Sequence, residues 1–187
     1  EKNCVPWNWR NKAKNHNFSL KDDVHYLLYI VGGKDMEERL WHKNYDEGVF
    51  PSLTYNMIPL KDVLVKAAQE YPMRDALIFL DTKITYGELN DAANRFANAL
   101  IALGVNPGDK VALLMPNMPQ FVIATYGVWK AGGVVVPNNP LYTDDELEYQ
   151  LNNSDSVLLV TLDLLADRMI ALKPRTKIKT IVVVHIQ

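Results

Sequence analysis

The sequence predicts an α/β fold, in which a mainly parallel sheet is flanked by helices. In the second half of the chain, short runs that are apolar on both faces alternate with helical patterns. Such strands need helices on both sides of the sheet, and parallel neighbours need a crossover between them. We expect the four strands at 111–115, 134–136, 157–160 and 181–184.

Two elements are expected before this alternation begins. Pro59, at the first position of a helix, precedes a stripe of apolar residues that ends near Tyr71. Apolar runs at 76–80 and 83–86 then flank Asp81-Thr82, which indicates a tight hairpin.

Capping patterns mark the helices that follow. Thr85 with Glu88 three residues later predicts a capping box, and the apolar stripe behind it ends at Gly104. Thr143 and Glu146 repeat the capping box in a later helix. Further helices are expected at about 119–131 and 162–172.

The chain divides into two unlike parts. Residues 1–35 are poorly patterned and are interpreted as an N-terminal extension, whereas 36–187 carry the regular elements. The extension is either a partner-binding arm or a segment without a selected role. Gly32-Gly33-Lys34-Asp35 is also what a purine-rich ribosome-binding site encodes in frame, so Met36 is a candidate native start.

Composition limits the classes of function. With 187 residues and 48% hydrophobic content, the chain is neither collagen-like, nor a disulfide scaffold, nor wholly disordered. A net charge of -2 gives no electrostatic reason to expect that the chain binds nucleic acid. The lone cysteine, Cys4, fits a cytoplasmic protein, and the apolar run 26–31 is too short to be a transmembrane segment.

Glycine-containing segments do not predict a phosphate loop. The segment 104–110 has the wrong spacing for a P-loop and lies before a strand instead of after it. Ala131-Gly132-Gly133 also enters a strand from a helix. Both are interpreted as turns.

No residue is assigned to catalysis, to a cofactor or to a metal. The four histidines lack a partner four residues later, and there is no C-x-x-C or H-E-x-x-H pattern. The acidic run 144–146 fits the first turn of a helix, where negative charge complements the helix dipole. The histidines are His16, His25, His42 and His185.

Several ordered segments from about residue 39 onward resemble the adenylate-forming (AMP-binding) superfamily. The segment Ile84-Thr-Tyr-Gly-Glu-Leu-Asn90 resembles its T-Y-x-E-L signature, and 129–137 is similar to its K-A-G-x-x-x-x-P signature. Between these two signatures, segments 103–111 and 117–121 also match the superfamily in order and spacing. In these segments we expect Thr85 and Glu88 to cap a helix, Tyr86 to supply a buried aromatic ring, and Ala131-Gly132 to turn a helix back onto the sheet.

Within this superfamily, segments 138–143 and 146–151 look most like medium- or long-chain fatty-acyl-CoA synthetases, with other carboxylates as the alternative. The resemblance implies a ligase that adenylates a fatty acid with ATP and Mg²⁺ and then forms a thioester with coenzyme A. It also implies that the chain is an incomplete N-terminal portion of the large domain, ending before the phosphate loop.

The chain alone is therefore expected to bind no cofactor and to be inactive. Uncovered sheet edges predict self-association. Two alternatives stay open: an autonomous α/β module that binds a ligand or partner, and one subunit of a split adenylate-forming enzyme.

Overall fold

The computed structural model describes residues 39–50, 52–53, 55 and 57–185. These residues fall into two units, one within 1–55 and one within 56–187. The first unit contains the short 3-10 helix η2 (His42–Asn44). Cys4, His16, His25, Met36 and the extension 1–35 lie outside the described residues, so the boundary at residue 36 stays a prediction.

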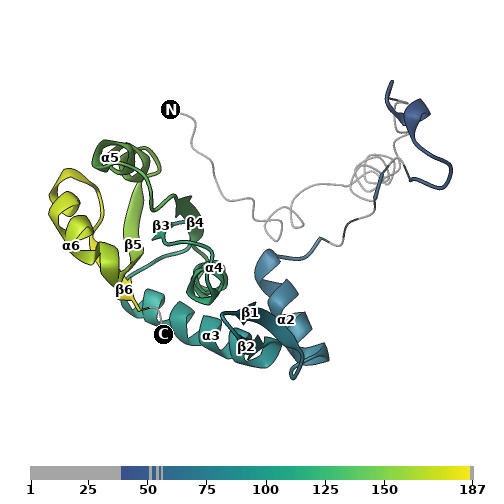
Figure 1. Cartoon of the computed structure of the whole chain (residues 1–187), viewed down its shortest axis with the longest axis horizontal. Coiled ribbons are helices and arrows are strands. Elements are labelled where there is room, and N and C mark those ends of the chain that lie inside the picture. Colours follow the sequence, from purple (N-terminus) through teal and green to yellow (C-terminus); the bar gives the residue numbers. More distant parts are fainter. Residues whose placement is uncertain (1–38, 51, 54, 56, 186–187) are drawn as a thin grey trace, which may run out of the picture. The chain divides into compact units, whose positions relative to one another are not determined.

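The second unit contains two sheets and five α-helices among the described residues (Figure 1). In chain order the elements are α2 (Leu60–Glu70), β1 (Asp75–Phe79), β2 (Thr82–Thr85), α3 (Tyr86–Ala102), β3 (Lys110–Leu114), α4 (Pro119–Lys130), β4 (Val134–Asn138), α5 (Asp144–Asn153), β5 (Ser156–Leu162), α6 (Asp163–Leu172), the 3-10 helix η3 (Lys173–Arg175) and β6 (Thr180–Val184).

The main sheet confirms the predicted α/β fold. Its four strands are parallel and lie in the order β4-β3-β5-β6. Helices connect the successive strands, as the alternation of apolar runs predicted. No helix among the described residues is both long and apolar enough to cross a bilayer.

The two faces of this sheet carry separate apolar clusters. Val111, Leu113 and Val160 pack with α3 and α4 on one face. Ala112 and Leu159 pack with α5 and α6 on the other face. Successive side chains of a strand point to opposite faces of the sheet. Helices therefore cover these strand side chains on both faces. Figure 1 shows α5 and α6 on one side of the strands and α3 and α4 on the other.

The capping boxes are confirmed in both helices. Thr85 Oγ1 accepts from the amide of Glu88, and the Glu88 carboxylate accepts from the Thr85 amide at 2.9 Å. Thr143 and Glu146 make the same pair of bonds at the start of α5. Gly104 follows α3 with φ +88°, the left-handed conformation that glycine adopts readily.

The hairpin turn differs from the prediction by one residue. Leu80 and Asp81 occupy the turn, with φ of 45° and 64°, and Thr82 instead pairs with Phe79 in the ladder. Aspartate tolerates positive φ, whereas β-branched threonine does not. This difference moves the turn away from Thr82.

Two further predictions were inaccurate in detail. Pro59 is the residue before α2, with ψ 142°, and the first helical residue is Leu60. Because its backbone is extended, Pro59 lies outside the helix, and its ring restricts the direction in which the chain enters α2. Tyr86 is half-buried instead of buried, and packs beside Leu64 and Leu89.

Candidate functional site

The carboxyl end of the parallel sheet is the place where this topology favours a ligand. The connection from β3 leads to β4 on one side, while β5 and β6 lie on the other side of β3. Ligands of open α/β sheets bind beyond the strand ends where the order reverses in this way. Between β3 and β5, Thr161 Oγ1 donates to the carbonyl oxygen of Leu114 at 3.3 Å and ties the two strand ends together.

An open depression lies beyond the ends of β3 and β4. Its walls are the loop after β3, the first turns of α4 and the segment that follows β4. The lining residues are Met115, Pro116, Asn117, Phe121, Pro137, Asn138, Asn139, Pro140 and Leu141.

Asn138 is the buried polar residue of this depression. It ends β4 and is 6% exposed. Its Nδ2 donates to the carbonyl oxygen of Val136 at 2.8 Å, while its Oδ1 is buried without a partner among the described residues. A buried acceptor left unpaired costs free energy, and a bound donor relieves that cost. The neighbouring Asn139 accepts from the amide of Leu141 at 3.0 Å and shapes the loop.

A second polar group lies where β6 ends. His185 Nδ1 is 2.8 Å from Asp163 Oδ2 at the start of α6. That hydrogen bond, together with one from the amide of Leu164, holds the pKa of Asp163 below its usual range. Gln120 of α4 donates through Nε2 to the carbonyl oxygen of His185 at 3.2 Å.

The acidic run at the start of α5 has partners within the protein. Asp144 lies 2.7 Å from Arg168 Nε, and Asp145 lies 2.9 Å from Arg175. Glu146 accepts from the backbone of Thr143, which lowers the pKa of Glu146. No group of three metal-ligating side chains was found among the described residues.

The glycine-containing segments lie at the opposite, amino end of the sheet. Gly108 and Gly132 have φ of +89° and +82° and are joined by a 2.9 Å bond from the Gly108 amide to the Gly132 carbonyl oxygen. A Cβ on Gly132 would lie 3.3 Å from Pro107. The geometry is that of two turns packed on one another, each leading into a strand.

Lys130 brings the two signature segments together. Its Nζ lies 2.6 Å from Oδ1 of Asn90 and 2.6 Å from Oδ1 of Asn94. Partial burial lowers the pKa of Lys130. Close to it, α3 and α4 approach so tightly that a Cβ on Gly127 would lie 2.6 Å from the ring of Phe96. These signature residues therefore fix helix packing at a distance from the carboxyl end.

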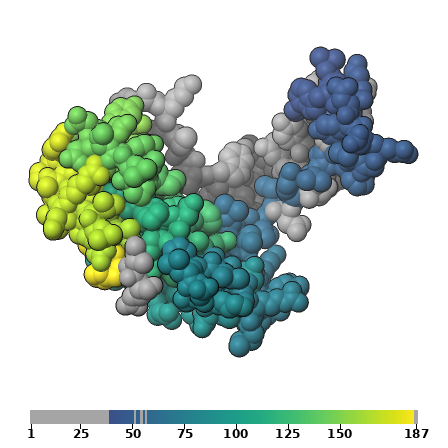
Figure 2. All heavy atoms as spheres, viewed as in Figure 1, coloured from purple at the N-terminus to yellow at the C-terminus, as the bar shows by residue number. Residues whose placement is uncertain are grey.

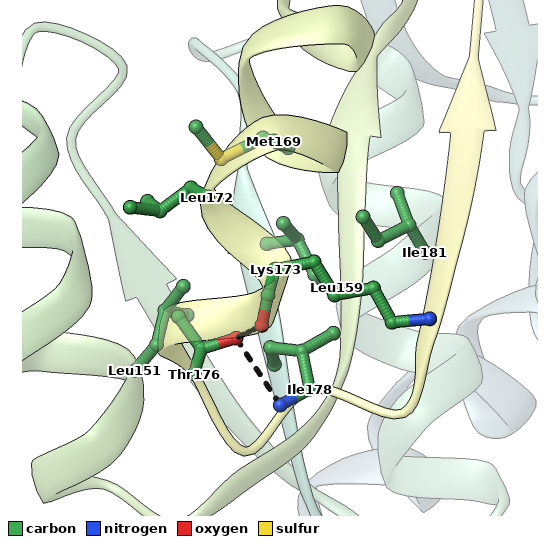
Figure 3. Close-up of a pocket in the computed structure, with 8 residues that line it drawn as sticks. All are labelled: Leu151, Leu159, Met169, Leu172, Lys173, Thr176, Ile178 and Ile181. Carbon is green, nitrogen blue, oxygen red and sulfur yellow. Dashed lines mark hydrogen bonds between the residues drawn. The ribbon is translucent and has the colours of Figure 1, made fainter.

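The apolar pocket between α6, η3 and the sheet is part of the core (Figure 3). It leaves no room for a water molecule. The Thr176 hydroxyl at its rim donates to the carbonyl oxygen of Lys173 and accepts from the amide of Ile178. In the space-filling view α5, α6 and β6, green to yellow, form one continuous surface (Figure 2).

The carboxyl-end depression does not fit a magnesium triphosphate. All of its lining residues are uncharged. Phosphoryl transfer needs cations around the phosphate oxygens, and Mg²⁺ prefers carboxylate ligands. The depression offers amides and apolar carbons, which suit a neutral polar group or an acyl chain.

Sequence reasoning assigned no role to Asn138, Gln120, Asp163 or His185. The sequence feature that could have indicated these residues is their position. Each one ends or follows an expected strand, or lies at the start of the helix after that strand. The order of the strands in the sheet decides which strand ends lie next to one another, and the sequence pattern does not predict that order.

Comparison with known proteins gives consistent matches. The family model for AMP-binding enzymes matches residues 64–187. A long-chain fatty-acid–CoA ligase of Bacillus subtilis is 35% identical over 150 residues, which are 80% of this chain and 27% of that protein. A medium/long-chain fatty-acid–CoA/3-oxocholest-4-en-26-oate–CoA ligase of Mycobacterium marinum is 42% identical over 127 residues, which are 67% of this chain and 23% of that protein.

Solved structures show the same relationship. The N-terminal domain of FACL13 from Mycobacterium tuberculosis matches with a TM-score of 0.64 and 31% identity, over 68% of this chain and 34% of that one. A long-chain fatty-acid–CoA ligase (FadD1) from Archaeoglobus fulgidus matches with a TM-score of 0.68 and 28% identity, over 72% of this chain and 29% of that one. The chain spans about a quarter of the length of the curated relatives it matches.

Proposed function

Because this chain belongs to the family of AMP-binding enzymes, we propose that it is part of a ligase that joins a fatty acid to coenzyme A at the expense of ATP. The observation that carries the proposal is the match to the N-terminal part of fatty-acid–CoA ligases, at 35% identity over 150 residues. In the complete enzyme, the fatty acid would form an acyl-adenylate with release of pyrophosphate. The thiol of coenzyme A would then displace AMP.

The substrate class is a proposal of its own. The names of the Bacillus subtilis and Mycobacterium marinum relatives include long-chain fatty acids. In support, the depression at the carboxyl end has an apolar wall that includes Phe121, Pro137 and Leu141. Other carboxylic acids are the alternative that the experiment below separates.

We assign a scaffold role to the described residues. The signature residues Lys130, Asn90 and Gly132 make contacts that hold α3, α4 and the turns in place. The residues around the depression lack the charges that a magnesium triphosphate requires. ATP, Mg²⁺ and coenzyme A are therefore proposed as requirements of the complete enzyme, with no site for them assigned to this chain.

A cytoplasmic location belongs to the same proposal. The sequence contains a single cysteine and so forms no internal disulfide, which fits a reducing compartment.

A chimeric enzyme tests the function. The segment of the Bacillus subtilis ligase that matches this chain is replaced by residues 39–185, and thioester formation is measured with palmitate and with benzoate. We expect activity with palmitate, and little with benzoate. A folded chimera that is inactive with both acids contradicts the proposal, and one that prefers benzoate contradicts the substrate class.

A matched variant controls for misassembly of the chimera. Ala93→Pro places a proline in the middle of α3, at a position that is 0% exposed. We expect this variant to lose both the activity and the circular dichroism signal of a folded protein. That loss would show that the activity of the chimera depends on the folding of the grafted segment.

A further inference from the structure

Apolar side chains are exposed around the carboxyl-end depression. Leu141 is 88% exposed, and it lines the depression together with Pro116 and Pro137, which are exposed as well. Met115, which is buried, and Phe121, which is half-buried, continue the same apolar lining. A single exposed leucine is common on protein surfaces, whereas several apolar side chains around one depression indicate a binding surface.

The loop that carries Leu141 is held on both sides of that residue. The side chain of Asn139 accepts a hydrogen bond from the amide of Leu141 at 3.0 Å, and the Asn139 carbonyl oxygen accepts one from the amide of Tyr142 at 3.1 Å. The ring of Tyr142 packs against the apolar cluster on the sheet face covered by α5 and α6. These contacts fix the backbone at Leu141, so its side chain stays at the rim of the depression.

Arg168 of α6 holds the end of this loop. Its Nη2 donates to the carbonyl oxygen of Tyr142 at 2.5 Å, and its Nε lies 2.7 Å from Asp144 Oδ1. The Arg168 side chain is 31% exposed, so salt and water screen these contacts less than those of a fully exposed pair. A guanidinium presents several donors in one rigid plane, and here it binds two acceptors on either side of the capping residue Thr143.

The chemistry of the depression favours an alkyl chain as its occupant. All of its lining residues are uncharged, so it offers no cation to a phosphate or carboxylate group. An alkyl chain that covers Leu141, Pro116 and Pro137 removes apolar surface from water, which is favourable. The fatty acid of the proposed function has both a charged head and a long alkyl chain, and only the alkyl chain fits this lining.

We propose that Leu141 is a specificity-determining residue of the ligase, which contacts the alkyl chain of the fatty acid, and that Arg168 is the positioning residue that holds the Leu141 loop. This inference rests on the proposed function, from which it takes the acyl substrate. Because the loop is fixed before the substrate binds, little conformational entropy is lost when the alkyl chain covers Leu141. Loss of either residue should therefore weaken the binding of the fatty acid and leave the chemical step intact.

Kinetics of the chimeric ligase provide the first test. We expect Leu141→Ser to raise the KM for palmitate roughly tenfold, with kcat and the KM for ATP unchanged. Arg168→Met should act in the same way, and Arg168→Lys less strongly, because lysine keeps a charge opposite Asp144. The control is Leu164→Ser, which changes a leucine of α6 that is 80% exposed and does not line the depression. A lower kcat with an unchanged KM in L141S, or an equal effect of L164S, overturns the proposal.

Photolabelling of the full 187-residue chain provides a second test, which does not depend on ligase activity. The probe is a palmitate analogue with a diazirine in its alkyl chain, and the labelled peptides are identified by mass spectrometry. We expect label within 115–121 and 137–142 that an excess of palmitate removes and an excess of benzoate does not. The label should be several times weaker in L141S and unchanged in L164S.

The labelling result separates this inference from the proposed function. If the chimera is inactive while the label is found as expected, the proposed function fails and the alkyl-chain site stands. No label, label elsewhere in the chain, or equal label in L141S and L164S overturns the site. So does a dimer of the chain that L141S dissociates in sedimentation, because a second copy would then cover Leu141.

Discussion

The Nζ atom of Lys130 in α4 lies 2.6 Å from Oδ1 of Asn90 in α3, although 40 residues separate them in the sequence. One residue belongs to each signature segment of the family. The same ammonium reaches Asn94 one turn further along α3. The two segments that identify the family are thus joined to each other, and their contact supports the packing of two helices.

Loss of the Lys130 ammonium should destabilise the folded chain. Lys130→Met keeps most of the apolar stem but leaves Asn90 and Asn94 without their donor. We expect the free energy of unfolding in urea to fall by about 1–2 kcal/mol. Lys66→Met, on the exposed side of α2, is the control and should change it by less than about 0.5 kcal/mol. Equal effects of the two variants would contradict the structural role of Lys130.

A Cβ at Gly132 should cost more than one at Gly104. Both glycines have positive φ, at +82° and +88°, so alanine is strained by the backbone at either position. Only at Gly132 would the new Cβ also meet Pro107, at 3.3 Å, whereas at Gly104 nothing lies within 4 Å. Thermal or urea unfolding should therefore show a larger loss for Gly132→Ala, by about 1 kcal/mol. A larger loss for Gly104→Ala would rule out the close packing of the two turns.

The capping boxes should make stability depend on acid pH. Hydrogen bonds from Thr85 hold the pKa of Glu88 below its ordinary 4.5. A carboxyl whose pKa is lower in the folded state stabilises the fold fully above 4.5, and this contribution disappears as the pH falls through the folded pKa. Unfolding measured from pH 7 to pH 3 should show a smaller loss in Glu88→Gln than in the natural chain. The same loss in both would mean that Glu88 is not bonded as described.

Local patterns account for most of what the sequence predicted correctly. The capping boxes at Thr85 and Thr143 depend on residues only three apart, and the apolar runs of the parallel strands need no knowledge of their neighbours. The hairpin turn was misplaced by one residue, because the register of β1 with β2 puts Leu80, a residue with no turn preference, at φ 45°.

Long-range contacts account for what the sequence could not predict. The bond from Lys130 to Asn90 and the tie from Thr161 to Leu114 join residues far apart in the chain. The unpartnered oxygen of Asn138 follows from the burial of the end of β4, which depends on the sheet order. The family resemblance indicated the scaffold correctly, and the residues that line the carboxyl-end depression required the structure.

Exchange of pyrophosphate into ATP tests most directly our proposal that these 187 residues are a scaffold part of a ligase and do not carry its adenylating centre. The purified chain is incubated with ATP, Mg²⁺, labelled pyrophosphate and palmitate, beside the Bacillus subtilis ligase as the positive control. We predict exchange by the control and none by the chain, with no saturable binding of ATP. Fatty-acid-dependent exchange by the chain alone would contradict the account, and saturable ATP binding without exchange would favour an autonomous binding module.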